Sequence, residues 1–416
     1  MAAIETMGRY RWVILGISLM CQATAALAGQ VLAPLAPLFQ PELGLTKAEV
    51  GLFSSATFAG AWAVILVAGT VTDRFGIRRM MTLGQLATGA LLLTMSSVVS
   101  ALQAAAVMFA AGLGRGTVFP GSTKAIMEWF PPATRATAMG IKQTGAPLAG
   151  IVTASTLPAL ALAIGWRSAI AVAGLAIILG GIITGLLYRD PGRSSRRREA
   201  TPGIRASLKD VTSNRRLWIV SIMAMLFVMS QQSLITYLAL YFKDVVLVPL
   251  VPDEPARIVA AGGYLAICQF GGIFGRVFWG AVSDRLFRRQ RLAVLAAIGL
   301  LSSAAALAVA GAESGYPSWL LTGLVFTAGA TTVGWNGVYH TLVTETVGHK
   351  HAATGVGLSL TLIETGTMVG PPLFGLVADL SGTYRMGWVS LVCISGAGTL
   401  IAALAARRDR RAEIAQ

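Results

Sequence analysis

The chain has 416 residues, of which 55% are hydrophobic and 12% are charged, and its formal net charge is +15. Its mean hydropathy is +0.69, so its apolar surface is too large to be hidden inside one soluble domain. This composition excludes a single soluble globular domain and indicates that the lipid bilayer is the solvent of most of the chain.

Twelve apolar segments are long enough to cross a membrane, because about 20 apolar residues span the roughly 30 Å of hydrocarbon in a bilayer. Every backbone polar group in lipid must be hydrogen-bonded within its own segment, so each segment is predicted to be a helix. The predicted spans are residues 10–37, 48–71, 80–101, 103–127, 134–162, 166–188, 217–242, 257–281, 291–311, 317–342, 353–379 and 385–406. The predicted fold class is therefore an all-α membrane protein with twelve transmembrane helices.

The basic residues gather on one side of this predicted topology. Four of the 33 Lys and Arg fall within spans, and most of the others lie on the side that holds both termini. This asymmetry is the positive-inside rule, and it predicts a multi-pass protein of the cytoplasmic (inner) membrane with both termini in the cytoplasm. It explains the net charge without nucleic acid, which is not expected as a partner. The basic residues on the opposite side are Lys47, Arg167, Lys243, Arg257 and Arg385.

Two internal matches indicate a duplication. The loop from Gly69 to Arg79, between the second and third spans, recurs 211 positions later from Gly280 onward. The Gly145-Ala-Pro-Leu-Ala-Gly segment recurs as Gly370-Pro-Pro-Leu-Phe-Gly, 225 positions later, and such glycines let helices approach closely. We predict two pseudo-symmetric six-helix bundles joined by a cytoplasmic linker. The predicted parts are residues 1–188, the linker 189–216 and residues 217–416.

The first loop matches the signature Gly-x-x-x-Asp-Arg-x-Gly-x-Arg-Arg, and through it the chain resembles the major facilitator superfamily over essentially its whole length. In the second copy, Phe287 replaces the inner glycine. The resemblance implies two bundles that alternate access to the substrate, and a cytoplasmic latch in which the aspartates cap helix ends and pair with arginines. The residues implied for this latch are Gly69, Asp73, Arg74, Gly76, Arg78, Asp284 and Arg285.

The charged residues inside the spans predict the class of substrate. Arg115, Lys124, Lys142 and Arg276 each cost at least about 2.5 kcal/mol at the bilayer centre unless they face water or a counter-charge. Glu364 is the one clearly intramembrane carboxylate in the predicted spans, so we expect a net positive cavity that binds an anion. Lys124 is close enough to the interface to extend its ammonium into water.

Depth selects Arg276 and Lys142 among these cations. Arg276 lies eight residues before Asp284, hence roughly 12 Å into the membrane at about 1.5 Å per residue. By the same rise, Lys142 lies at a comparable depth in the fifth span, next to Gln143. Arg276 has no counterpart in the first half, where Ile65 stands, which favours a role in substrate binding over a role in the scaffold.

Further resemblances refine the predicted site. The segment Gly275–Asp284 is similar to the eighth span of oxalate/formate antiporters and monocarboxylate transporters, whose arginine binds the substrate carboxylate. Gly334–Tyr339 is similar to the tenth span of the oxalate/formate group, which implies that Trp335 and Tyr339 line the pocket. These two residues are four apart and share a helix face, and packing aromatics are the alternative interpretation. The predicted substrate-binding residues are Arg276, Lys142, Gln143, Arg115, Trp335 and Tyr339.

The chain also departs from these groups. Oxalate/formate antiporters carry a lysine in the eleventh span, where this chain has Glu364, and its own lysine, Lys142, is in the fifth. The fourth span resembles organic anion symporters of the sialin and hexonate type, with Arg115 in place of their coupling glutamate. Glu364 is therefore the candidate for proton coupling, and a fixed counter-ion to Lys142 or Arg115 is the alternative.

We predict a secondary active transporter. An enzyme has little support, because the loops show no nucleophile–base pair, phosphate loop or zinc spacing. No enzyme activity, catalytic residue, cofactor or metal is expected. The predicted cargo is a small mono- or dicarboxylate, moved by proton symport or anion exchange. Proton-coupled efflux of drugs or cations is the alternative, favoured by Pro147 and the glycines around it. The expected partners are the anion, protons and the lipid bilayer, and the protein is expected to be a monomer.

Overall fold

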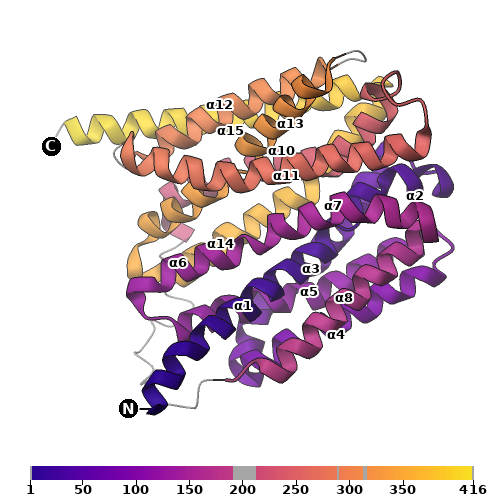
Figure 1. Cartoon of the computed structure of the whole chain (residues 1–416). Helices are drawn as coiled ribbons and strands as arrows, with labels where there is room; N and C mark the ends of the chain where they lie inside the picture. The colour runs from indigo at the N-terminus through magenta and orange to yellow at the C-terminus, as the bar shows by residue number, and fades with distance from the viewer. Residues whose placement is uncertain (1, 191–211, 288–289, 313–315, 415–416) are drawn as a thin grey trace. The chain divides into compact units, whose positions relative to one another are not determined.

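The computed structural model describes residues 2–190, 212–287, 290–312 and 316–414, and all regular secondary structure in these ranges is helical (Figure 1). The chain divides into two compact units. Unit 1 comprises Met1–Leu43 and Ala56–Arg196, and unit 2 comprises Gly44–Ser55 and Arg197–Gln416. Most of the predicted linker, residues 191–211, lies outside the described residues.

Unit 1 contains α1 (Ala2–Gln30), η1 (Ala33–Leu35), α2 (Ala36–Leu43), the greater part of α3 (Lys47–Phe75), α4 (Ile77–Leu93), η2 (Thr94–Ser97), α5 (Ala101–Trp129), α6 (Pro132–Gln143), α7 (Gly145–Ile164) and α8 (Trp166–Leu187). Unit 2 contains the first turns of α3, α10 (Arg215–Tyr241), η3 (Phe242–Val246), α11 (Glu254–Arg285), α12 (Arg291–Ala310), α13 (Ser318–Thr332), α14 (Asn336–Ser381) and α15 (Tyr384–Ile414).

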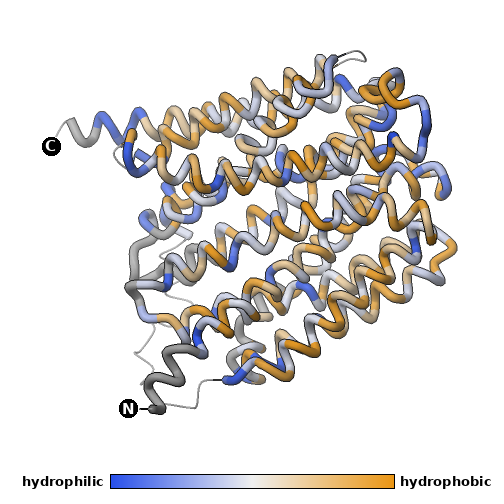
Figure 2. The backbone as a smooth tube through the Cα atoms, in the orientation of Figure 1, coloured by the Kyte–Doolittle hydropathy of each residue, from blue (hydrophilic) through white to orange (hydrophobic). Residues whose placement is uncertain are grey.

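Every predicted span coincides with one of these helices or with a run of consecutive ones, which confirms the all-α prediction. Among the described residues, nine helices are long and apolar enough to cross a membrane. Figure 2 shows apolar stretches along the helices and hydrophilic residues gathered at many of their ends. The loop predicted between the tenth and eleventh spans, residues 343–352, is helical instead. These residues belong to α14, a single helix of 46 residues. No proline occurs between the tenth and eleventh predicted spans to end the helix there.

The sequence repeat is also a repeat of packing within the units. In unit 1, α4 packs against α8 and α1 against α7, and in unit 2, α12 packs against α15 and α10 against α14 (Figure 1). A Cβ added at Gly145 would lie 2.7 Å from the Leu19 carbonyl oxygen of α1. The matching Gly370 would bring a Cβ to 2.6 Å from the Met229 carbonyl oxygen of α10. The two matched glycines therefore allow the same close approach of helices in both units.

Two predicted spans are interrupted at their middle. The fifth breaks at Thr144, between α6 and α7, because Pro147 has no N–H to donate to the Gln143 carbonyl and its ring crowds that oxygen. The tenth breaks after α13 ends at Thr332, and α14 begins only at Asn336. Broken spans are a common feature of substrate sites in transporters, so these two breaks direct attention to the residues beside them.

Candidate functional site

Lys142 lies at the first break, in the last turn of α6, and its side chain is fully buried. Its Nζ donates a hydrogen bond of 2.8 Å to the Thr123 hydroxyl and lies 4.3 Å from the centroid of the Phe119 ring. Within the described part of the chain, no carboxylate forms an ion pair with Lys142. A hydroxyl and an aromatic face stabilise a buried ammonium only partly, so an anion brought close to Nζ gains a strong interaction.

Arg115 lies on the face of α5 that Lys142 contacts. It precedes Phe119 by four residues, which places it one helical turn away on that face. Its Nε donates to the Ala25 carbonyl on α1 at 2.9 Å, and its guanidinium carbon lies 4.7 Å from the centroid of the Phe58 ring. The tertiary structure of unit 1 thus brings Arg115 and Lys142 to consecutive turns of one helix face, on either side of Phe119.

The neighbouring polar residues differ from Lys142 in their surroundings. Lys124 lies 3.8 Å from Glu128, one turn later on α5, and both side chains are about one-third exposed. This pair agrees with the interpretation of Lys124 as an interface residue. Gln143 is half-buried and ends α6, directly after Lys142.

Arg276 belongs to unit 2 and is half-buried on α11, beside the second helix break. A Cβ at Gly275 would lie 2.0 Å from the Ala330 carbonyl oxygen of α13, and a Cβ at Gly337 would lie 3.3 Å from the Arg276 carbonyl oxygen. Trp279, one turn after Gly275, donates its indole N–H to the Ala330 carbonyl at 2.9 Å. The backbone around Arg276 is therefore packed directly against the residues that flank the break.

Trp335 and Tyr339 are almost completely buried in the hydrophobic core of unit 2. Their ring centroids lie 5.2 Å apart, as expected for residues on one helix face, and Trp335 also packs edge-on against Phe227. The Tyr339 hydroxyl is hydrogen-bonded to the Ser359 hydroxyl. This environment matches the alternative interpretation of these aromatics as packing residues, and their contact with substrate stays a prediction.

Gln231 is a polar residue of this region that we did not predict from the sequence. Its Oε1 accepts hydrogen bonds of 3.0 Å from the indole N–H of Trp335 and from the side-chain amide of Asn336. The same Asn336 amide donates to the Val333 carbonyl at 3.0 Å. Gln231 therefore ties α10 to the start of α14, directly after the break. The sequence feature that could have predicted a role for Gln231 is the polar pair Gln231-Gln232 in the middle of an apolar span.

Glu364 is half-buried on α14 in unit 2, two residues before Gly366. A Cβ at Gly366 would lie 2.5 Å from the Met225 carbonyl oxygen, so this part of α14 packs closely on α10. The two cations named as its possible counter-ions, Lys142 and Arg115, belong to unit 1. Proton coupling and a counter-ion role both stay predictions for Glu364.

The second latch copy forms an ion-pair cluster around Arg291 at the start of α12. Arg291 lies 2.6 Å from Asp284 and 3.4 Å from Glu345, and it also donates to the Ser283 hydroxyl at 2.8 Å. The sequence prediction paired Asp284 with Arg285, which is exposed. Arg291 was missed because it stands outside the repeated motif, although it is a charge at the start of a predicted span.

In the first latch copy, Gly76 has a φ of 91°, a conformation that favours glycine, and it directly precedes α4. Arg78 donates from Nε to the Gly185 carbonyl at 2.7 Å and from its backbone N–H to Asp190 at 3.4 Å. Arg74 is exposed. The side chain of Asp73, and the surroundings of Gly69, lie outside what the structure describes, so their predicted contacts stay predictions.

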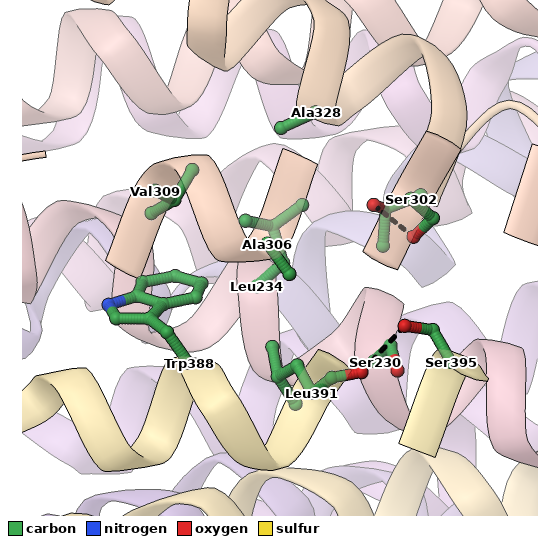
Figure 3. A pocket seen from close by; sticks show the side chains of 10 residues that line it. Ser230, Leu234, Ser302, Ala306, Val309, Ala328, Trp388, Leu391 and Ser395 are labelled. Carbon is green, nitrogen blue, oxygen red and sulfur yellow. Dashed lines mark hydrogen bonds between the residues drawn. The ribbon is translucent and has the colours of Figure 1, made fainter. Parts of the chain in front are cut away.

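An internal cavity of unit 2, shown in Figure 3, is too small to be the substrate site. Its volume is about 10 Å³, which is room for about one water molecule. Serine and apolar side chains line it, among them Ser230, Ser302, Trp388 and Ser395. An organic anion therefore has to be bound elsewhere.

Comparison with known proteins identifies the family. Residues 18–363 match the Major Facilitator Superfamily. The chain is 26% identical over 410 residues to the probable sulfoacetate transporter of Cupriavidus necator, covering 94% of this chain and 92% of that protein. It is 28% identical to the 3-(3-hydroxy-phenyl)propionate transporter of Escherichia coli, with 87% and 84% of the two chains covered.

The fold agrees with this match. The structure superposes on a bacterial homologue of the human lysosomal transporter Spinster with a TM-score of 0.76 and 16% identity, covering 96% of this chain and 97% of that one. The family match spans most of the chain, the repeated loops carry the expected signature, and the helices pack as two repeats. The chain therefore belongs to the Major Facilitator Superfamily of membrane transporters.

Proposed function

We propose that this transporter carries a small organic anion, a mono- or dicarboxylate or a related acid. The observation that carries the proposal is Lys142, a fully buried lysine with no ion pair to a carboxylate among the described residues. A charged side chain inside a membrane costs at least about 2.5 kcal/mol, and a bound anion offsets that cost. Arg115 on the neighbouring turn of α5 adds a second positive charge on the same face.

The names of the relatives support this substrate class. Sulfoacetate and 3-(3-hydroxyphenyl)propionate are both small organic acids, one with two anionic groups and one with a single carboxylate and an aromatic ring. In unit 2, Arg276 beside the second helix break supplies a guanidinium, which binds a carboxylate through two parallel hydrogen bonds. Lys142, Arg115 and Arg276 are the proposed anion-binding cations, with Gln143, Trp335 and Tyr339 as further proposed contacts.

The proposed mechanism is alternating access, in which the site opens to one face of the membrane at a time, with proton symport or anion exchange as the energy source. The proposed location is the cytoplasmic membrane with both termini inside, on the basis of the positive-inside pattern. We propose that the active form is a monomer. The latch residues Asp73 and Asp284, with their arginines, would stabilise one of the alternating states.

Uptake by purified protein in liposomes tests the function. Radiolabelled sulfoacetate and 3-(3-hydroxyphenyl)propionate are offered to the wild type, to Lys142→Gln and to Lys124→Gln, which removes a lysine that is paired with Glu128. We expect the wild type and Lys124→Gln to accumulate at least one acid, and Lys142→Gln to lose uptake while remaining folded. Uptake of neither acid, together with transport of a cationic drug, would establish the efflux alternative instead.

A further inference from the structure

The polarity of the hydrogen bonds around Gln231 is determined by Trp335. An indole N–H can only donate, so the atom of Gln231 that lies 3.0 Å from Trp335 Nε1 is the amide oxygen. The Asn336 contact to the same oxygen must then come from the Asn336 amino group, which also donates to the Val333 carbonyl. The usual ambiguity between the oxygen and nitrogen of a side-chain amide is absent here.

This arrangement leaves Gln231 with two N–H donors on the opposite end of its amide. In the part of the chain that the structure describes, Nε2 of Gln231 donates to no protein acceptor. Gln231 is half-buried in the middle of α10, within a span where water is scarce. The two bonds to its oxygen already set the orientation of the amide, so Nε2 can donate to an acceptor that comes within reach.

The position of Gln231 connects it with Arg276. Asn336, its hydrogen-bond partner, directly precedes Gly337, and a Cβ at Gly337 would lie 3.3 Å from the Arg276 carbonyl oxygen. Gln231 on α10 and Arg276 on α11 therefore meet the same short segment at the second helix break, from two different helices of unit 2.

We propose that Gln231 is a specificity-determining residue of the anion site, which donates from Nε2 to an oxygen of the acid that Arg276 binds. The inference rests on the proposed function and adds a neutral, oriented donor to its cations. Because the amide is held in place before the substrate arrives, little ordering cost is incurred on binding. An acid with a second oxygen-bearing group near its carboxylate gains most from such a donor.

Gln231→Glu tests this proposal, because the variant keeps an oxygen that accepts from Trp335 and Asn336 and replaces the amino group by a second, anionic oxygen. The probe is whichever of sulfoacetate and 3-(3-hydroxyphenyl)propionate the wild type takes up faster in liposomes. We expect the KM of Gln231→Glu to rise about tenfold or more, as for loss of a hydrogen bond to a charged group. Lowering the pH should reduce this defect, since a protonated glutamic acid donates again.

Gln231→Met is the second variant, in case Gln231→Glu does not fold. It lacks both donor and acceptor, and we expect the acid to raise its thermal unfolding midpoint less than it raises that of the wild type. A wild-type KM in Gln231→Glu, or a wild-type ligand shift in Gln231→Met, would overturn the inference and leave the proposed function intact. Uptake of neither acid by the wild type, together with transport of a cationic drug, would overturn both.

Discussion

The carboxylate of Asp379, near the end of α14, accepts hydrogen bonds from the backbone amides of Lys47 at 3.1 Å and Ala48 at 2.7 Å. Asp379 therefore caps the first turn of α3, from a position 331 residues away in the sequence. Four residues earlier, a Cβ at Gly375 would lie 2.4 Å from the Lys47 carbonyl oxygen, so only glycine allows this approach. The spacing Gly375-x-x-x-Asp379 is that of the two latch motifs, Gly69 to Asp73 and Gly280 to Asp284.

Asp379→Ala should destabilise the protein by about 1 kcal/mol, the usual cost of removing a helix N-cap side chain. The expected result is a lower thermal unfolding midpoint in detergent. Lys47→Met is the control, because it removes the ion pair of 3.7 Å, together with the contact of the ammonium with the Tyr384 ring at 4.9 Å, and leaves both capped amides in place. Equal midpoints for the two variants would show that the cap contributes nothing beyond the ion pair.

Gly275→Ala should prevent correct folding of unit 2. The added Cβ would lie 2.0 Å from the Ala330 carbonyl oxygen, and since that atom is backbone, α11 and α13 would have to separate. We expect little monodisperse protein on size-exclusion chromatography. Gly263→Ala, on the same helix with nothing within 4 Å of its added Cβ, should behave as the wild type. A normal yield of Gly275→Ala would contradict the close packing described here.

Arg276→Gln should abolish anion uptake and leave the protein folded. Loss of one partner from a buried charge pair costs about 2–5 kcal/mol, so uptake at subsaturating substrate should fall at least about thirtyfold. The measurement is initial uptake in liposomes, with the thermal unfolding midpoint as the control for folding. Wild-type uptake by this variant would remove Arg276 from the site.

Asp284 and Arg291 form an ion pair of 2.6 Å, so exchanging the two charges should preserve it. The double variant Asp284→Arg with Arg291→Asp should therefore regain uptake or stability that either single variant loses. The expected loss in each single variant is a lower uptake rate or a lower unfolding midpoint, and the double variant should recover a part of it. Arg285→Gln is the comparison, since the sequence motif pairs Asp284 with Arg285. A larger effect for Arg285→Gln than for Arg291→Gln would favour the pairing predicted from the motif.

Glu364→Gln separates proton symport from anion exchange. If Glu364 carries the proton, the variant should lose uptake driven by a pH gradient and keep exchange of internal for external anion. If Glu364 is a fixed counter-ion, both modes should weaken together. The measurement compares the two modes in the same liposomes, with and without an imposed pH gradient.

The sequence was sufficient for the broad features of this protein. Apolar segments of membrane-spanning length require helices, because no other single segment satisfies its backbone in lipid. The repeated loops and the glycines Gly145 and Gly370 revealed the duplication, since residues that admit a close backbone approach are read directly from the chain. The intramembrane cations likewise indicated an anionic substrate, because a charged side chain in lipid is costly and usually marks a substrate or ion pathway.

The tertiary structure alone decided which of these residues are neighbours. It placed Lys142 against the turn of α5 that follows Arg115. It also found Arg291 as the partner of Asp284 and Gln231 as the acceptor for Trp335. Depth along a span follows from counting residues, but the direction of a side chain around the helix, and the helix it meets, depend on packing between segments far apart in sequence.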